Sequence, residues 1–181
     1  LAAEDSLRSL LRRDDLHGCH FLDAGSGSGL FSLAAHRLGA AVTSFDVDPD
    51  SVACTQELKL RYGRDGVDDW RVFHGSLLDN AFLDTLGEFE VVYCWGVAHH
   101  TGSMWTAIEN LSSCVKPHGW LVLAIYNDQL YISRAWRTVK RIYHCLPVMV
   151  RPLYVIGIGL AAFTKRLLVT ILACLLRLLT L

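Results

Sequence analysis

Residues 22–29 read Leu-Asp-Ala-Gly-Ser-Gly-Ser-Gly and lie directly between an apolar run and a helical pattern. Glycines at alternate positions let the backbone turn tightly and approach a ligand without obstruction by side chains. The start of the helix that follows offers unpaired N–H groups to the same ligand. This strand, loop and helix predict an α/β protein that binds a nucleotide-like molecule.

Short apolar or β-branched runs alternate with helical patterns over the first 128 residues, which is typical of βαβ units and a parallel sheet. Several runs are almost entirely apolar, as in strands that helices cover on both faces. We expect strands at 19–23, 41–46, 70–74, 90–95 and 119–126. We expect helices at 4–13, 30–38, 50–62, 81–86 and 104–115. Gly39, Gly63 and Gly87 follow three of these helices, where a left-handed residue is common.

The net charge of −1 conceals a division of the chain. Residues 1–128 hold 9 basic and 18 acidic side chains, whereas residues 129–181 hold 8 basic and none acidic. We therefore expect two parts, a sheet domain at 1–128 with its first helix within 1–16, and a helical tail at 129–181. A tail without carboxylates favours an anionic partner, either phospholipid or nucleic acid.

The tail combines its basic charge with apolar residues at helical spacing. Its longest uncharged spans, 152–164 and 167–176, have 13 and 10 residues, whereas a membrane-spanning helix needs about 20. We expect a helix that lies in the headgroup layer, on the inner face of a membrane in the cytoplasm. Packing against a missing part of the protein is the alternative. Nucleic-acid binding is not expected, because the aromatic residues lie on the apolar face.

Two acidic residues indicate the kind of ligand. Asp46 closes the next strand, 21 residues after Gly25, where a carboxylate can accept hydrogen bonds from both hydroxyls of a ribose. Asp23 stands before the glycines and suits an ammonium group better than a pyrophosphate. Leu30 occupies the position of the third glycine of a dinucleotide-binding loop. A ligand with a ribose and a cationic amino-acid end is therefore expected.

With these features the chain resembles the class I S-adenosylmethionine-dependent methyltransferases, within their small-molecule, ubiquinone-methylase-like group. The matching segments are LDAGSGSG (22–29), SFDVDP (44–49), HGSLLD (74–79), FEVVYCWGVAHHTG (89–102) and VKPHGWLVLAIYND, which ends at residue 128. Together they cover roughly residues 19–128. The resemblance implies a Rossmann-like, doubly wound, mostly parallel sheet with helices on both faces.

The resemblance also implies where S-adenosyl-L-methionine binds. Asp23 would hold its amino end and Asp46 its ribose, while Val47 and Leu77 would enclose the adenine beside Ser76. Many relatives have Asp where this chain has Ser76, so weaker adenine binding is expected. The full set expected at the cofactor is Asp23, Ala24, Gly25, Ser26, Gly27, Gly29, Asp46, Val47, Ser76, Leu77 and Trp95.

The methyl acceptor is expected beside the end of the fourth strand, as a small or lipophilic molecule. If its reacting atom is a hydroxyl, a base must take the proton, and His99 and His100 are the candidates. The same histidines are also compatible with a bracing role, and Trp95 with simple packing. The spacing of histidines and cysteines predicts no metal site. The cysteines are expected to be reduced thiols of an intracellular protein.

Some expectations concern what the segment lacks. The start at Leu1 without a signal peptide suggests a trimmed chain. The family's two final strands are not found, which favours a chain cut short within a longer protein. Two rival functions remain, a nicotinamide-dependent oxidoreductase and a catalytically silent, membrane-attached interaction domain.

Overall fold

The computed structural model describes residues 2–64, 69–127 and 129–179, with several side chains beyond Thr164 outside the description. The chain divides into two compact units, Leu1–Tyr126 and Asn127–Leu181. The boundary expected at residue 128 falls on a position outside the described ranges. Each unit is considered by itself.

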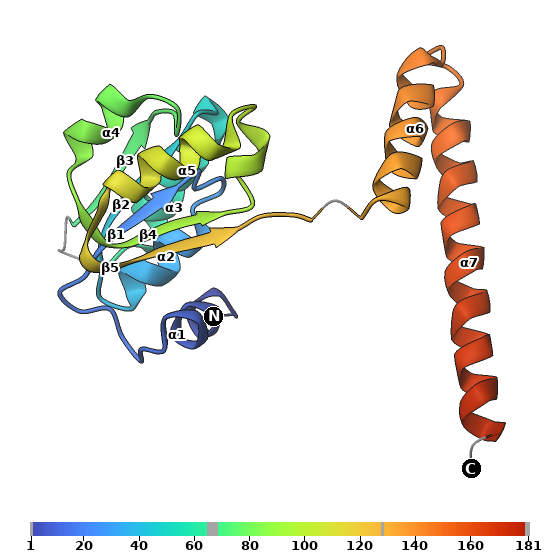
Figure 1. The fold of residues 1–181 in the computed structure, drawn as a ribbon, viewed down its shortest axis with the longest axis horizontal. Coiled ribbons are helices and arrows are strands. Elements are labelled where there is room, and N and C mark those ends of the chain that lie inside the picture. Colours follow the sequence, from blue (N-terminus) through green and yellow to red (C-terminus); the bar gives the residue numbers. More distant parts are fainter. Residues whose placement is uncertain (1, 65–68, 128, 180–181) are drawn as a thin grey trace. The chain divides into compact units, whose positions relative to one another are not determined.

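A parallel sheet with the strand order β3-β2-β1-β4-β5 forms the centre of the first unit (Figure 1). Its strands are β1 (His20–Ala24), β2 (Ala41–Asp46), β3 (Trp70–His74), β4 (Phe89–Trp95) and β5 (Val115–Ala124). The order reverses at β1, because β2 and β3 extend to one side and β4 and β5 to the other. Ligands of such sheets bind at the carboxyl ends of the strands beside this reversal.

Helices cover both faces of the sheet, as expected of a doubly wound fold. The helices of the unit are α1 (Ala2–Leu11), α2 (Leu30–Arg37), α3 (Pro49–Tyr62), α4 (Asn80–Leu86) and α5 (Met104–Ser113). One core joins α1 and α2 to Phe21, Trp70 and Tyr93. The other core joins α4 and α5 to Phe45 and Phe89. The predicted Rossmann-like fold is therefore confirmed.

Two local expectations were wrong. β5 begins at Val115 instead of residue 119, and its pairing with β4 is irregular between Phe89 and Val91. Gly63 is extended, with φ −61°, instead of left-handed. A Cβ at Gly63 would lie 2.6 Å from Lys59 O, so the glycine is required by a close backbone approach.

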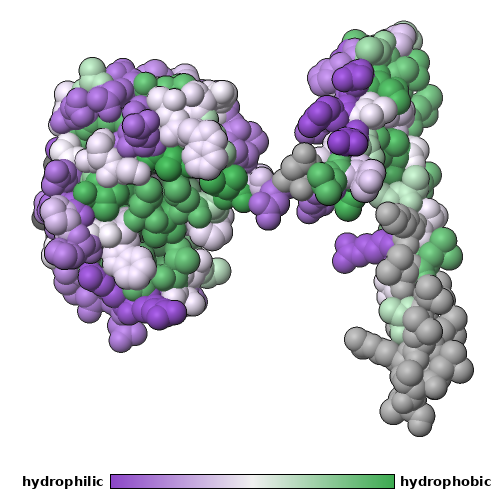
Figure 2. Space-filling model, viewed as in Figure 1, coloured by the Kyte–Doolittle hydropathy of each residue, from purple (hydrophilic) through white to green (hydrophobic). Residues whose placement is uncertain are grey.

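The second unit is a pair of helices, α6 (Tyr131–Cys145) and α7 (Arg151–Leu179). Arg151 Nε donates to Leu146 O (3.1 Å) and Arg151 Nη2 to His144 O (3.4 Å), which satisfies carbonyls at the end of α6. In Figure 2, polar side chains gather on α6 and apolar ones along the first turns of α7. None of the helices in the described ranges is both long and apolar enough to span a bilayer.

Candidate functional site

The loop between β1 and α2 is fixed to the end of β2. Gly25 N and Ser26 N both donate to Phe45 O, at 2.9 and 3.0 Å. Gly27 is left-handed, with φ 54°, and a Cβ there would meet no described atom within 4 Å. The backbone of Gly27 is thus open to a ligand, in a conformation that favours glycine.

Asp46 joins this loop to the chain after β2. Its Oδ2 accepts from Gly27 N (2.9 Å), and its Oδ1 accepts from Asp48 N (3.0 Å). Each carboxylate oxygen has a second lone pair, so both can still accept a hydrogen bond from a ligand hydroxyl. Asp48, not Asp46, caps α3, since its carboxylate accepts from Asp50 N and Ser51 N. The expected division of roles between these acids is consistent with this geometry.

Asp23 lies deeper, at the end of a chain of buried hydrogen bonds. Ser32 Oγ donates to Asp23 Oδ2 (2.5 Å), Ser44 Oγ donates to Ser32 Oγ (2.8 Å), and Trp70 Nε1 donates to Ser44 Oγ (2.8 Å). These groups come from β1, α2, β2 and β3, so the chain crosses three neighbouring strands. Sequence reasoning missed Ser32, Ser44 and Trp70 as partners of Asp23.

The electrostatics of Asp23 follow from its burial. The residue is 3% exposed. Desolvation raises its pKa from 3.8 to about 6, against the opposing effect of the Ser32 hydrogen bond and with a smaller upward contribution from Asp46. A nearby cation would favour the ionised form. The position is therefore suited to an ammonium group.

The residues expected at the adenine lie in two different environments. Val47 is 62% exposed, and its carbonyl pairs with His74 Nε2 (2.9 Å). Leu77 is buried in the core beside α5, and Asn110 Nδ2 donates to its carbonyl (3.0 Å). Ser76 is half-buried, and its hydroxyl accepts from Leu78 N (3.2 Å). Val47 is thus available to a ligand, whereas Leu77 is packed against protein.

Three further residues expected at the cofactor, Ala24, Ser26 and Gly29, also differ in environment. Ala24 is fully buried in the core. Ser26 Oγ lies 3.4 Å from Thr55 Oγ1, which in turn donates to Gly27 O (3.1 Å). A Cβ at Gly29 would lie 2.8 Å from the same Thr55 hydroxyl. The close packing of α3 against the glycine loop is therefore sufficient to explain why residue 29 is a glycine, and no ligand is needed for that explanation.

The segment after β4 packs against the glycine loop from the other side. A Cβ at Gly25 would lie 2.6 Å from Val97 Cγ1, which makes any larger residue there incompatible with this packing. Trp95 is 46% exposed and stacks on Tyr93, with ring centroids 5.8 Å apart and planes at 9°. Phe31 of α2 lies against the other two rings. Trp95 therefore presents an aromatic surface beside the loop.

His99 lies in a short 3₁₀ helix, Ala98–His100, directly after this segment. Its ring lies 4.0 Å from the ring of His100 and 4.8 Å from that of Tyr126, measured between centroids. Both ring nitrogens are buried, and neither has a hydrogen-bond partner among the described residues. Burial, and next the neighbouring His100, lower the pKa of His99. Both effects favour the neutral imidazole, in which one ring nitrogen carries a lone pair.

Among the described residues, no cluster of His, Cys, Asp or Glu is arranged to hold a metal ion. The hydroxyl of Tyr93 is a further buried group without a hydrogen-bond partner there. Burial, with a smaller effect of Asp23, raises the pKa of Tyr93. The polar groups at the carboxyl ends of β1, β2 and β4 thus include two carboxylates, a glycine loop whose amides pair with Phe45 O and Asp46, and a histidine with a lowered pKa.

Comparison with known sequences shows which proteins this chain resembles. Residues 22–121 match the family model of a methyltransferase domain, which is more than half of the chain. Ubiquinone biosynthesis O-methyltransferase of Xanthomonas euvesicatoria pv. vesicatoria is 32% identical over 115 residues, 64% of this chain and 46% of that protein. The corresponding enzyme of Xanthomonas oryzae pv. oryzae gives the same identity and coverage. The chain spans about half the length of these curated relatives.

Solved structures share the fold at lower identity. The YcgJ protein of Bacillus subtilis superposes with a TM-score of 0.62 at 17% identity, over 78% of this chain and 58% of that one. Magnesium protoporphyrin IX methyltransferase of Synechocystis, solved with bound S-adenosylhomocysteine, gives a TM-score of 0.58 at 22% identity. That match covers 81% of this chain and 62% of that enzyme.

Proposed function

This chain belongs to the class I S-adenosylmethionine-dependent methyltransferase family, and from that premise we propose that it transfers a methyl group to a hydroxyl of a small, lipophilic acceptor. The curated relatives are named for O-methylation in ubiquinone biosynthesis, which supports a hydroxyl on a lipophilic molecule. The comparisons do not favour the nicotinamide-dependent or the catalytically silent alternative.

The observation that carries the proposal is the bridge between Asp46 and Gly27. A carboxylate at the end of β2, fixed by a hydrogen bond from the glycine loop, is positioned to accept hydrogen bonds from a ribose. Val47 follows it with an exposed apolar side chain for the adenine. Asp23 supplies the negative charge for the ammonium end, directly or through water. These residues fit an adenosyl amino acid.

His99 is the proposed general base. When bound, S-adenosylmethionine supplies an electrophilic methyl carbon. His99 takes the proton of the acceptor hydroxyl at a ring nitrogen, so that the oxygen can attack. The surface of Trp95, backed by Tyr93 and Phe31, is proposed to hold the acceptor and to exclude water. Holding the two reactants in line supplies much of the rate enhancement.

Ligand-dependent stabilisation tests the cofactor assignment. S-adenosylhomocysteine at about 100 times its dissociation constant should raise the free energy of unfolding by ~2.7 kcal/mol. Asp46→Ala should abolish this increase, whereas Asp50→Ala, which removes an exposed acid four residues away, should retain it. Thermal shift with S-adenosylhomocysteine, NAD and ATP provides the measurement. Stabilisation by NAD alone would refute the proposal.

We further propose that the second unit attaches the protein peripherally to an anionic membrane surface, on the cytoplasmic side. Basic residues near an anionic leaflet each contribute about 1 kcal/mol. The outward face of α7 supplies apolar side chains at spacings of three and four residues, and all of them are exposed. They are Leu153, Ile156, Leu160, Phe163 and Leu167. Monomeric soluble proteins rarely leave such a continuous apolar surface uncovered.

Vesicle sedimentation tests this attachment. The wild-type chain should sediment with vesicles of phosphatidylcholine and phosphatidylglycerol and remain in the supernatant with phosphatidylcholine alone. Leu160→Asp, at a 60% exposed position on α7, should reduce sedimentation. Leu60→Asp, at an 81% exposed position on α3, is the matched control and should leave it unchanged. Equal behaviour of the two variants would contradict attachment through α7.

A further inference from the structure

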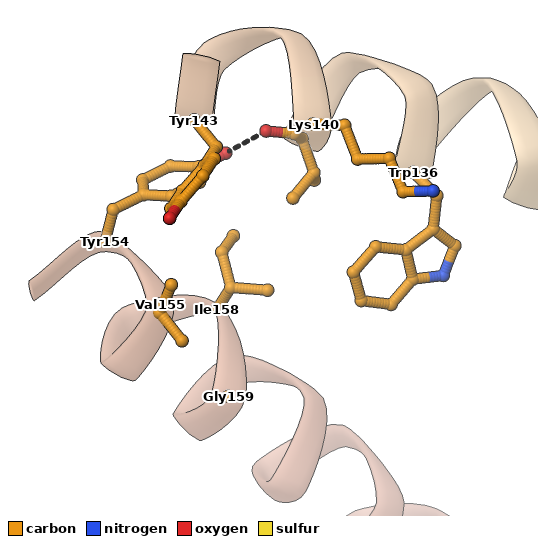
Figure 3. A pocket seen from close by; sticks show the side chains of 8 residues that line it. Trp136, Lys140, Tyr143, Tyr154, Val155, Ile158 and Gly159 are labelled. Atoms are coloured by element: carbon orange, nitrogen blue, oxygen red, sulfur yellow. Dashed lines mark hydrogen bonds between the residues drawn. The ribbon is translucent and has the colours of Figure 1, made fainter. Parts of the chain in front are cut away.

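Two cavities adjoin each other on α6. The first lies between α6 and α7 and has a volume of about 330 Å³ (Figure 3). Its walls are almost entirely apolar, and Tyr154 Oη donates to Val139 O (3.2 Å) beside it, joining the two helices. The lining residues are Trp136, Val139, Lys140, Tyr143, Tyr154, Val155, Ile158 and Gly159.

The second cavity, of about 400 Å³, lies at the start of α6 and is more polar than the first. Arg137 lines it together with Ser133, whose hydroxyl accepts from Gln129 N (2.9 Å). Trp136 and Lys140 line both cavities. These two residues are four apart on one helix, so their side chains are neighbours. The cavities therefore meet at Trp136 and Lys140. Apolar side chains line the first cavity, and the cationic groups of Arg137 and Lys140 line the second.

Neither helix of this unit carries a carboxylate that would balance the positive charge of the polar cavity, and Asp128, which precedes them in the same unit, lies outside the described residues. Residues 129–181 contain no Asp or Glu, so no carboxylate of this segment neutralises Arg137 or Lys140. Arg and Lys are the side chains that bind phosphate groups, Arg through paired N–H donors and Lys as a point charge. A phosphate between them is therefore the matching anion.

We propose that the two cavities form one binding site for a single anionic phospholipid of the membrane. Its phosphate lies with Ser133, Arg137 and Lys140, and one acyl chain lies in the cleft between α6 and α7. The inference deepens the proposed membrane attachment and rests on it. A second copy of the chain docked through the same segment is the less suitable occupant, because it would bring another eight cations against the first eight.

Filling the apolar cleft tests the acyl-chain site. Gly159 lines the cleft and Gly157 does not, and a Cβ at either position would meet nothing within 4 Å. Gly159→Leu should therefore fill the cleft, while Gly157→Leu introduces the same residue into the same helix without doing so. Dioctanoylphosphatidylglycerol below its critical micelle concentration is the probe, with stoichiometry from native mass spectrometry and affinity from calorimetry. We expect one lipid per wild-type chain, at least about tenfold weaker binding to Gly159→Leu, and unchanged binding to Gly157→Leu.

Removing charge tests the headgroup site. Arg137→Gln with Lys140→Gln should weaken binding of the same lipid by about tenfold or more, because both charge-assisted hydrogen bonds to phosphate are lost. Arg134→Gln with Arg141→Gln removes the same charge from α6 at residues that line neither cavity, and binding should persist. Dioctanoylphosphatidylcholine should bind the wild type more weakly than the anionic lipid.

The two proposals fail in different ways. Absence of short-chain lipid binding by the wild type, or equal loss in a variant and its matched control, overturns the lipid site. Vesicle sedimentation of the same proteins reports on membrane attachment separately, and Gly159→Leu should sediment like the wild type because its charge and outward apolar face are intact. Failure of the wild type to sediment with anionic vesicles overturns the attachment.

Discussion

Ser32 Oγ donates a 2.5 Å hydrogen bond to Asp23 Oδ2, so the first turn of α2 holds the carboxylate that ends β1. Ser44 and Trp70 continue this chain of hydrogen bonds beneath it. Because burial raises the pKa of Asp23 to about 6, its charge near neutral pH depends on these partners and on any cation above it. The proposed ammonium ligand would supply that cation.

Asp23→Asn should stabilise the fold and abolish cofactor binding. The folded chain keeps a proton on Asp23 between pH 3.8 and about 6, after the unfolded chain has released it. The free energy of unfolding therefore falls as pH rises through this window, and the ionised carboxylate is destabilising at pH 7. Replacement by the isosteric amide should raise the free energy of unfolding at pH 7 by about 1–3 kcal/mol. Urea unfolding measures this change, and binding of S-adenosylhomocysteine should be lost.

The contrast with low pH provides the control for this prediction. Near pH 4 Asp23 is protonated in the folded chain, so Asp23→Asn should have little effect on stability there. Asp46→Asn, at a half-buried position with hydrogen bonds to the loop, should not stabilise at either pH. An equal effect of Asp23→Asn at both pH values would show that burial of the charge is not the cause.

Ser32→Ala should shift the pH dependence of cofactor binding. The Ser32 hydrogen bond favours the ionised carboxylate, so its removal should raise the pKa of Asp23 further. We expect weaker binding of S-adenosylhomocysteine at about pH 6 and recovery toward wild-type affinity at about pH 8. Calorimetric titration at the two pH values tests this, with the exposed Ser9→Ala as control. A deficit that is the same at both pH values would indicate a purely structural role.

The sequence predicted the five strands of the sheet and the bounds of two of them, because the relevant signals are local. The runs 41–46 and 70–74 coincide with β2 and β3, and Asp46 follows β2 as expected. The hydrogen-bond chain from Trp70 to Asp23 could not be predicted in the same way. It depends on the strand order β3-β2-β1 and on the pairing of Asp23 with Ser44. The only local signal was the presence of two serines, Ser32 and Ser44, in a helix and a strand that are otherwise mainly apolar.

The sequence also could not predict that the ring nitrogens of His99 are buried without a hydrogen-bond partner among the described residues. The motif named two adjacent histidines, with no basis for separating them. The structure distinguishes them through burial, because His100 is exposed whereas both nitrogens of His99 are covered and unpaired among the described residues. The ring of His99 packs against Tyr126, a residue 27 positions further along the chain, and such a contact has no local signal in the sequence.

A second buried histidine predicts an acid-sensitive fold. His36 Nε2 lies 2.7 Å from Asp69 Oδ1, and Arg64 pairs with the other oxygen of Asp69. Burial lowers the pKa of His36, with Asp69 acting in the opposite direction. In the unfolded chain, His36 therefore binds a proton near pH 6.5. In the folded chain it binds this proton only at a lower pH. The stability contributed by neutral His36 is present above this pH and is lost as pH falls below it.

Asp69→Asn should enlarge this loss, because it removes the group that raises the pKa of His36. The free energy of unfolding should then fall more steeply below pH 6.5, by up to about 1.4 kcal/mol per pH unit. Thermal unfolding between about pH 5 and pH 8 gives the profile. His20→Gln, at an exposed position, should leave the slope unchanged. A slope that Asp69→Asn does not alter would exclude His36 as the titrating group.

His99→Phe tests the proposed base directly. Phenylalanine keeps an aromatic ring against Tyr126 and His100 and removes two buried nitrogens that lack partners among the described residues. The free energy of unfolding should be unchanged or rise by about 1 kcal/mol, because unsatisfied polar atoms leave the interior. The rate of methyl transfer from labelled S-adenosylmethionine to a lipophilic phenol should fall by about 10²–10⁴-fold. Binding of S-adenosylhomocysteine should persist.

The pH profile of the methyl-transfer rate, measured for His99→Phe and His100→Phe, distinguishes a general base from a packing residue. If His99 is the base, the wild-type rate rises with pH through its depressed pKa and is level above it, and His99→Phe lacks this limb. His100→Phe, at the exposed neighbour, should retain both the limb and most of the rate. Loss of the limb in His100→Phe alone would transfer the role to His100. Full activity of His99→Phe would leave its ring as a packing element of the loop.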